Sequence, residues 1–324
     1  MAFRNAAGAC LCALSFIMVP GLVSAQEWPA HTVRAVVPLT PASATDIAAR
    51  TVLSQLSNQI GQPIIVENRP GAGNTIGMAA VARAEPDGYT LLINSSSHTV
   101  VPATFSQLPF DTLRDLSPVI PFGNVPIVVV VLPSKGYKNL GDLVAAARAK
   151  PGAMSYSTAG AGNFSHLATE AFRRIAAFEA VHIPSKGAPE AITEVLAGRA
   201  DFFFSPLTVA LPLIRDGRLQ ALAVSGSQRA LALPDVPTTS QAGFPNSEYN
   251  FWVAMFVPAK TPAAVTSLLY RETAKALENP DVRAKLAAVG IDPMPMSQSA
   301  FAALLDKEVR LNTTIANASG LKIN

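Results

Sequence analysis

The chain has 324 residues, with 25 basic and 22 acidic side chains and a formal net charge of +3. A charge this close to neutral, with no basic patch, argues against a nucleic-acid partner. A chain of this length exceeds the size at which one hydrophobic core usually keeps growing, so we expect two domains.

The first 25 residues have the pattern of a secretory signal peptide. Arg4 precedes an apolar run over residues 6–23, which ends in the small residues Val-Ser-Ala. Both cysteines, Cys10 and Cys12, lie inside this segment, so cleavage after Ala25 would leave 299 of the 324 residues and no cysteine. Disulfides and cysteine-ligated metals are thereby excluded. No later apolar run approaches membrane-spanning length, so we expect a soluble protein outside the cytoplasm.

Strands and helices alternate along the first part of the chain. Apolar or β-branched runs predict strands at 32–39, 63–68 and 90–94. Helical spacing predicts a helix at 44–60, which stops at a glycine, and a second helix that ends near residue 84. This alternation favours an α/β fold with parallel sheets.

The same alternation returns in a second set of elements. The predicted strands are 127–132, 154–157, 181–184, 201–204 and 219–224, and the helices between them are 140–150, about 164–177 and 189–197. A strand at 251–257 and two or three helices end the chain. We therefore expect two α/β lobes: residues 26–124 with 251–324 form lobe 1, and residues 125–250 form lobe 2. The chain crosses twice between them, which makes a hinge of two strands beside a cleft.

The turn between the first strand and the first helix has the chemistry of an anion site. Ser43 followed three residues later by Asp46 is typical of a capping box, so the helix is predicted to begin at Ala44. The first N–H groups of a helix are unpaired and lie at the positive end of its dipole. With the hydroxyl of Thr40 nearby, this turn suits a carboxylate. An ordinary capped helix without a ligand would show the same pattern.

Motifs of catalysis are missing from the sequence. The four histidines show no His-x-x-x-His spacing, and there is neither a Gly-x-Ser-x-Gly elbow nor a phosphate-binding loop. Gly71 to Gly77 mimics a dinucleotide fingerprint, but its spacing is Gly-x-Gly-x-x-x-Gly and it follows the second strand. His166 lies where a helix follows a glycine-rich loop, which favours capping or packing over proton transfer. We therefore expect no enzyme, no cofactor and no metal.

Hydroxyl-rich or glycine-rich loops follow several predicted strands in both lobes. They are Ser95–His98, Thr158–His166, Ser185–Gly187 and the pair Ser205-Pro206. Ligands of open α/β sheets bind outside the carboxyl ends of the strands. Two facing lobes that carry such loops predict a cleft that closes by a hinge motion.

Six segments, spread over nearly the whole mature chain, carry a resemblance to a known family. They are residues 37–50, Val66–Gly73, Pro86–Leu92, Ser165–Glu170, His182–Gly187 and Leu233–Thr238. In these segments the chain resembles the Bug family, the TctC-like extracytoplasmic solute receptors of tripartite tricarboxylate transporters. The resemblance implies a periplasmic binding protein of the type II fold, which holds a carboxylate or a related small solute between two lobes.

By position, the resemblance places the carboxylate-gripping turn at Thr40 to Asp46 and the contacts of the second lobe at Thr158 to Asn163 and Ser185 to Gly187. The predicted ligand-binding residues are Leu39, Thr40, Ala42, Ser43, Ala44, Asp46, Ser95, Ser96, Thr158, Ala159, Gly160, Gly162, Asn163, His166, Ser185, Lys186 and Ser205. Asp46 is expected to orient the turn, because its charge repels an anion.

Two departures from the family pattern bear on the ligand. Ala42 and Ser43 stand where the family usually has two glycines, which restricts the backbone while Ser43 adds a hydroxyl. Ser185 stands where the family usually has tyrosine, which widens this side of the cleft.

The expected function is capture of a small carboxylate and its delivery, by a monomer, to membrane subunits of a tripartite tricarboxylate-type transporter. Two other classes stay open at this point. One is a periplasmic component that presents ligand to a two-component sensor. The other is a secreted hydrolase, for which the sequence offers no nucleophile–base pair.

Overall fold

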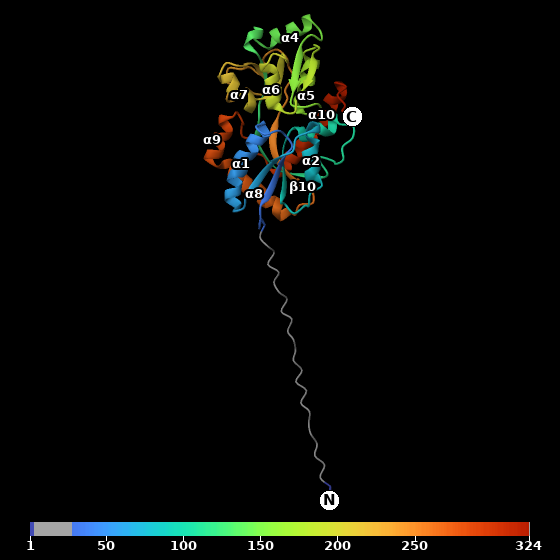
Figure 1. The fold of residues 1–324 in the computed structure, drawn as a ribbon, viewed down its shortest axis with the longest axis vertical. Helices are drawn as coiled ribbons and strands as arrows, with labels where there is room; N and C mark the ends of the chain where they lie inside the picture. The colour runs from blue at the N-terminus through green and yellow to red at the C-terminus, as the bar shows by residue number, and fades with distance from the viewer. Residues whose placement is uncertain (3–27, 324) are drawn as a thin grey trace.

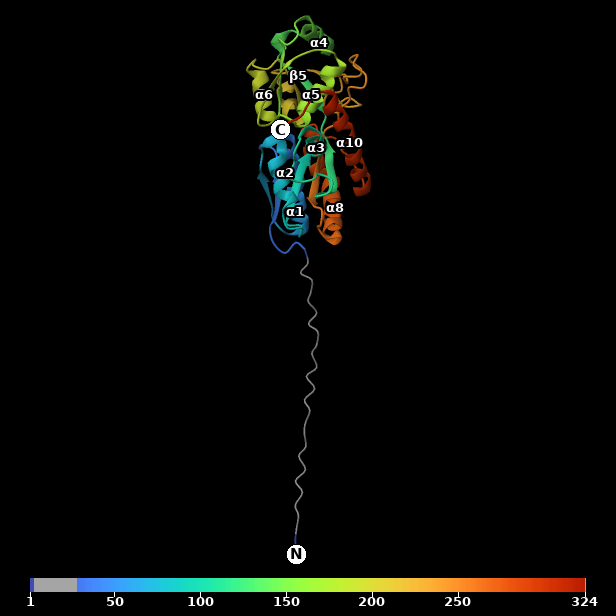
Figure 2. The ribbon, with the colours of Figure 1, turned by 90° about the vertical axis from the view of Figure 1, so that its right-hand side faces the viewer.

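The computed structural model describes residues 1–2 and 28–323, so the predicted signal peptide lies outside the described residues apart from Met1 and Ala2. Two lobes are stacked along the long axis, and the C-terminal end lies where they meet (Figures 1 and 2). Within the described ranges, no helix combines the length and the apolar character needed to span a bilayer.

Lobe 1 is built on a five-stranded sheet with the order β2-β1-β3-β10-β4. Its strands are β1 (Val33–Val37), β2 (Ile64–Asn68), β3 (Thr90–Ser95), β4 (Leu116–Asn124) and β10 (Trp252–Pro258). β1 is parallel to both β2 and β3, whereas β10 is antiparallel to β3 and β4. The carboxyl ends of β1, β2 and β3 therefore meet at one edge of the sheet.

Alternate residues of the lobe 1 strands face two helical layers. Val37 and Ile93 share a core with α1 (Ala44–Ile60), α8 (Ala263–Glu278) and α9 (Pro280–Ala288). Val36 and Leu92 share another core with α2 (Thr75–Ala82), α3 (Ser97–Thr104) and α10 (Gln298–Ala318). A 3-10 turn, η1 (Ala72–Asn74), precedes α2.

Lobe 2 carries a second five-stranded sheet, with the order β7-β6-β8-β5-β9. Its strands are β5 (Ile127–Val131), β6 (Ser155–Thr158), β7 (Val181–Pro184), β8 (Phe202–Pro206) and β9 (Gln220–Val224). Helices α4 (Leu140–Ala149) and α5 (Phe164–Ile175) cover one face, and α6 (Ala188–Leu196) and α7 (Leu207–Arg215) cover the other. A 3-10 turn, η2 (Pro133–Lys135), follows β5.

The sequence-based prediction of an α/β fold with two lobes is confirmed, but the prediction of parallel sheets is wrong at the hinge strands. β5 runs antiparallel to both β8 and β9, as β10 does to its neighbours, because the chain enters each of these strands directly from the other lobe. Helices α3 and α7 and strand β4 were not predicted. Pro102 and Pro212 lie inside those two helices, where proline normally argues against a helix.

Candidate ligand-binding site

Ser43 and Asp46 cap α1 as the sequence indicates. The Ser43 side chain accepts a hydrogen bond from the Asp46 N–H at 3.3 Å. The return contact differs from a standard capping box, because Asp46 Oδ2 accepts from the Ala42 N–H at 3.0 Å. Ala42 has a φ of 60°, a left-handed conformation that is costly for a residue with a Cβ. The turn thus keeps a conformation suited to glycine although alanine stands there.

Asp46 is the centre of the hydrogen bonds that hold this turn. Arg50 Nε donates to its carboxylate at 3.0 Å, and Asn68 Nδ2 donates to it at 2.9 Å and to the Leu39 carbonyl at 3.0 Å. Burial raises the pKa of Asp46, but the donors Arg50, Asn68 and the Ala42 N–H outweigh this and hold the pKa below its usual value. Asp46 therefore orients the turn, as predicted.

Two N–H groups at the start of α1 lack a hydrogen-bond partner in the described part of the chain. The Ala44 and Thr45 N–H groups have no hydrogen-bond partner within residues 28–323. The Oγ1 atoms of Thr40 and Thr45 are likewise buried without a partner in this part of the chain. Buried polar atoms in proteins are nearly always paired, so this group of donors is typical of a binding site.

The loop between β6 and α5 is the part of lobe 2 that lies against lobe 1. Asn163 caps α5, and its Oδ1 accepts from the N–H and the hydroxyl of Ser165 at 3.0 and 2.9 Å. Ser165 Oγ in turn accepts from the Ala159 N–H at 2.9 Å. These bonds fix the Asn163 amide, while its buried Nδ2 has no partner in the described chain. An ideal Cβ on Gly160 would lie 3.2 Å from that Nδ2, so the amide donor lies against the glycine turn.

Three histidines are enclosed by the fold: His98 and His166 are buried, and His182 is half-buried. His166 and His182 stack with ring centroids 3.8 Å apart, His166 Nδ1 accepts from the Gly162 N–H, and His182 Nε2 is hydrogen-bonded to Thr158 Oγ1 at 2.7 Å. Burial lowers the pKa of His166 to about 3 and that of His182 to about 4. Burial also lowers the pKa of His98, which stacks on a phenylalanine in lobe 1, to about 3. His166 thus stabilises the glycine-rich loop through the hydrogen bond from the Gly162 N–H to its ring.

We expect the free energy of unfolding to fall as the pH is lowered from 7 to 5. His98, His166 and His182 stay neutral in the folded protein, whereas in the unfolded chain each binds a proton near pH 6.5. Below that pH each histidine lowers stability by up to about 1.4 kcal/mol per pH unit, until its folded pKa is reached.

Urea unfolding at pH 7, 6 and 5 measures this loss. His98→Phe removes one of the three contributing histidines and should make the pH dependence of the free energy of unfolding less steep. A free energy of unfolding that does not vary between pH 7 and 5 would contradict the burial of neutral histidines.

The structure brings the turn of lobe 1 and the loops of lobe 2 into contact. An ideal Cβ on Gly187 would overlap Thr40 Oγ1, and one on Gly73 would lie 2.9 Å from the Ala161 carbonyl oxygen. A Cβ on Gly160 would lie 3.8 Å from the Ser185 carbonyl oxygen. The starts of α1, α5 and α6 therefore come together where the two lobes meet.

Other residues predicted to bind the ligand are exposed, or are hydrogen-bonded within the fold. Leu39 is buried in the core and offers only its backbone, and Lys186 is exposed. Ser96 Oγ accepts from the Trp252 N–H at 2.9 Å, so it ties α3 to the hinge strand. Ser95 Oγ accepts from a backbone N–H, and Ser205 Oγ donates to the following carbonyl at 3.1 Å.

The sequence analysis did not identify Asn68, Asn74 and Thr208. Asn68 braces the anion turn because it pairs in register with Val37, at the carboxyl end of the neighbouring parallel strand. The sequence could have indicated this contact, because the first two predicted strands are consecutive and were expected to be parallel. Asn74 Nδ2 and Thr208 Oγ1 are buried and unpartnered among residues 28–323, which no sequence pattern indicates.

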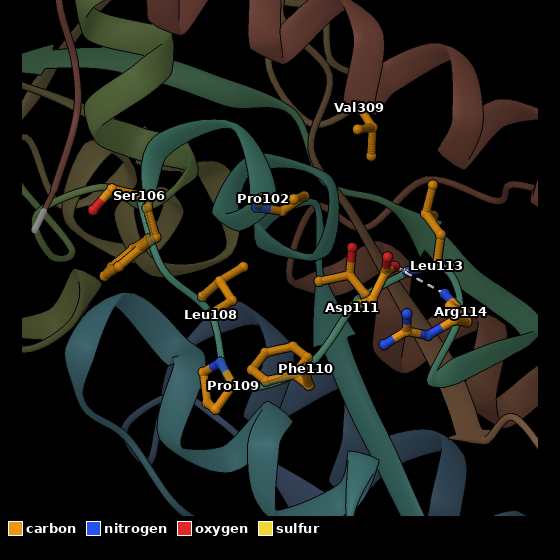
Figure 3. Close-up of a pocket in the computed structure, with 11 residues that line it drawn as sticks. Pro102, Ser106, Leu108, Pro109, Phe110, Asp111, Leu113, Arg114 and Val309 are labelled. Carbon is orange, nitrogen blue, oxygen red and sulfur yellow. Dashed lines mark hydrogen bonds between the residues drawn. The ribbon is translucent and has the colours of Figure 1, made fainter.

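A hollow of about 670 Å³ in lobe 1 shares no residue with the predicted site. It is formed by the end of α3, the loop from Phe105 to Arg114 and Val309 of α10 (Figure 3). Within the described residues, no group of three or more His, Cys, Asp or Glu side chains is arranged to hold a metal ion.

The family model described as "Tripartite tricarboxylate transporter family receptor" matches residues 48–321. The chain belongs to this receptor family. BugT of Bordetella pertussis is 33% identical over 313 residues, which cover 95% of this chain and 96% of BugT. The resemblance to Bug receptors seen in the sequence is thus confirmed, and so is the prediction that the protein is not an enzyme.

Two solved structures of Rhodopseudomonas palustris proteins have the same fold. One, described with adipate, is 28% identical with a TM-score of 0.88 and covers 92% of this chain and 100% of its own. The other, MatC with bound malate, is 28% identical with a TM-score of 0.85 and covers 89% and 99%. The receptor is therefore a periplasmic solute-binding protein of the TctC and Bug type.

Proposed function

We propose that this receptor captures a small carboxylate between its lobes and delivers it to a tripartite tricarboxylate-type membrane transporter. The observation that carries the proposal is the set of unpaired donors on both sides of the place where the lobes meet: the Ala44 and Thr45 N–H groups in lobe 1 and Asn163 Nδ2 in lobe 2. A carboxylate offers about four lone-pair sites to such donors. The relatives described with adipate and malate support an acid with two carboxylates.

The proposed binding mode needs no ion pair. One carboxylate accepts from the start of α1 and from the hydroxyls of Thr40 and Ser43, and the positive end of the helix dipole stabilises its charge. The other end of the acid meets the loops at Gly160–Asn163 and Ser185. A ligand shifts the hinge equilibrium only by binding the closed form better than the open form, and contacts to both lobes provide this difference.

The remaining predictions belong to the same proposal. The mature protein begins at Gln26 after cleavage behind Ala25, acts in the periplasm as a monomer, and folds as lobe 1 (26–124 and 251–324) and lobe 2 (125–250). The sheets agree with this division, since β1–β4 and β10 form one and β5–β9 the other.

A thermal-shift screen followed by calorimetry tests the ligand class. We expect adipate, malate or a related dicarboxylate to raise the melting temperature of the mature protein, because a ligand that binds only the folded state stabilises it. Adipamide, the uncharged diamide of adipate, is the matched control and should have no effect.

Monocarboxylates, tricarboxylates, aromatic acids and amino acids complete the panel. The absence of a shift with every acid would contradict an anion site. Loss of uptake of the radiolabelled acid in a strain without this receptor, with recovery on complementation, tests delivery to a transporter.

A further inference from the structure

The C-terminal residues Leu321–Ile323 run alongside the end of α3. The Ile323 N–H donates to the Thr104 carbonyl at 2.7 Å, and the Ser106 N–H donates to the Ile323 carbonyl at 3.0 Å. Lys322 Nζ adds a bond to the Ala103 carbonyl at 2.9 Å. These bonds attach the C-terminal segment firmly to lobe 1, at the level where the two lobes meet (Figure 2).

The same segment reaches lobe 2 at Gly162, in the loop that precedes α5. Thr104 Oγ1 donates to the Gly162 carbonyl at 2.6 Å, and both residues are buried. An ideal Cβ on Gly162 would lie 2.8 Å from Ile323 Cγ1 and 2.9 Å from Phe105 Cε2. Side chains of lobe 1 are thus packed directly against the backbone of a lobe 2 loop.

Phe105 also fits closely on its other side. An ideal Cβ on Gly73 would lie 2.7 Å from Phe105 Cζ and 2.9 Å from the Ala161 carbonyl oxygen. The phenyl ring therefore lies between glycine loops of both lobes, and neither glycine leaves room for a side chain. Phe105 and its neighbour Ser106 also line the hollow of about 670 Å³ in lobe 1 (Figure 3).

We propose that Thr104, Phe105 and Ile323 form a latch that holds the closed form of the receptor through the Gly162 loop. The latch is distinct from the predicted hinge, where the chain crosses between the lobes after β4 and before β10. Its contacts join the lobes directly, so a hinge motion that separates the lobes breaks them. Because Gly160–Asn163 belongs to the proposed binding loop, the latch also sets how fast a captured acid is released.

The magnitude follows from the hydrogen bond. Thr104→Val keeps the shape of the side chain but leaves the Gly162 carbonyl unpaired whenever the lobes close. The penalty for such a buried group corresponds to about a tenfold lower ratio of closed to open protein. Ile323→Ala removes packing at the same loop and should act in the same direction.

Pulsed electron–electron resonance on the mature chain tests the latch. That chain has no native cysteine, so spin labels at Asn58→Cys on α1 and Ala145→Cys on α4, both exposed, report the distance between the lobes. We expect a short-distance population that Thr104→Val and Ile323→Ala each reduce about tenfold relative to the long one. Thr313→Val is the matched control, because Thr313 Oγ1 donates only to the Val309 carbonyl within lobe 1.

The measurement is made without added acid and again with adipate or malate. The measurement without acid tests the latch even if neither acid binds. The measurement with acid shows separately whether the proposed ligand class is wrong. A wild-type distribution without the short distance would overturn the proposal. The proposal would also be overturned if Thr104→Val and Ile323→Ala gave the same ratio of short to long distances as Thr313→Val, with melting temperatures equal to that of the wild type.

Discussion

Replacement of Ser43 by aspartate is expected to abolish carboxylate binding while the fold stays intact. Aspartate caps helices as well as serine does, so it can accept from the Asp46 N–H in place of the Ser43 hydroxyl. It also puts a negative charge where we propose that the ligand carboxylate lies. Two like charges about 4 Å apart near a protein surface repel by about 4 kcal/mol, which corresponds to roughly a thousandfold loss of affinity.

Ser43→Asn is the matched control for this variant. Asparagine has nearly the same size and also caps helices, but it carries no charge. Calorimetry with the acid found in the screen should show a modest change for Ser43→Asn and no measurable binding for Ser43→Asp, with similar melting temperatures. Equal affinities of the two variants would place the carboxylate away from the start of α1.

Gly187→Ala should block closure of the lobes without unfolding either of them. Gly187 has an extended φ of −175°, which any residue adopts, so the variant adds no backbone strain. Its new methyl group, however, would overlap Thr40 Oγ1 of the other lobe. Thr40 Cγ2 and Cβ would also lie 3.1 and 3.2 Å from that methyl group, so rotation of the hydroxyl does not remove the crowding. We therefore expect affinity to fall by about 30-fold, equivalent to about 2 kcal/mol.

Thr40→Ala, combined with Gly187→Ala, separates this steric effect from a lost ligand contact. Removal of the Thr40 hydroxyl makes room for the methyl group, although Thr40→Ala alone weakens binding by one hydrogen bond. The double variant should therefore bind better than Gly187→Ala alone, a coupling that calorimetry of all four proteins measures. Additive losses would show that the two residues do not meet in the bound state.

The anion turn was predictable because its signals are local. The apolar strand, the Ser43 cap and the carboxylate three residues later each depend on spacing within a few residues, and the structure has all of them. The predicted helix at 140–150 forms as α4 with the same chemistry, because the Asn139 side chain accepts from the Asp142 N–H at 2.9 Å. Local hydrogen bonds of this kind need no knowledge of the rest of the fold.

The features that were not predictable depend on distant parts of the chain. Helices α3 and α7 keep a proline each because packing against the sheets outweighs helix propensity. The antiparallel direction of β5 and β10 depends on where the chain crosses between lobes. The bracing by Asn68 and the contacts at Gly162 and Gly187 join residues far apart in sequence, so only the assembled lobes show them.

The place of β10 between β3 and β4 also constrains the order in which the protein can fold. β3 and β4 do not pair with each other, and each pairs with β10, which the chain reaches only at Trp252. A chain that emerges with its N-terminus first therefore has the continuous segment of lobe 2 complete while the sheet of lobe 1 still has open edges at β3 and β4. Open edges of this kind invite pairing with other chains until the missing strand arrives. The sheet of lobe 1, which carries the anion turn, is therefore complete only after β10 has been synthesised.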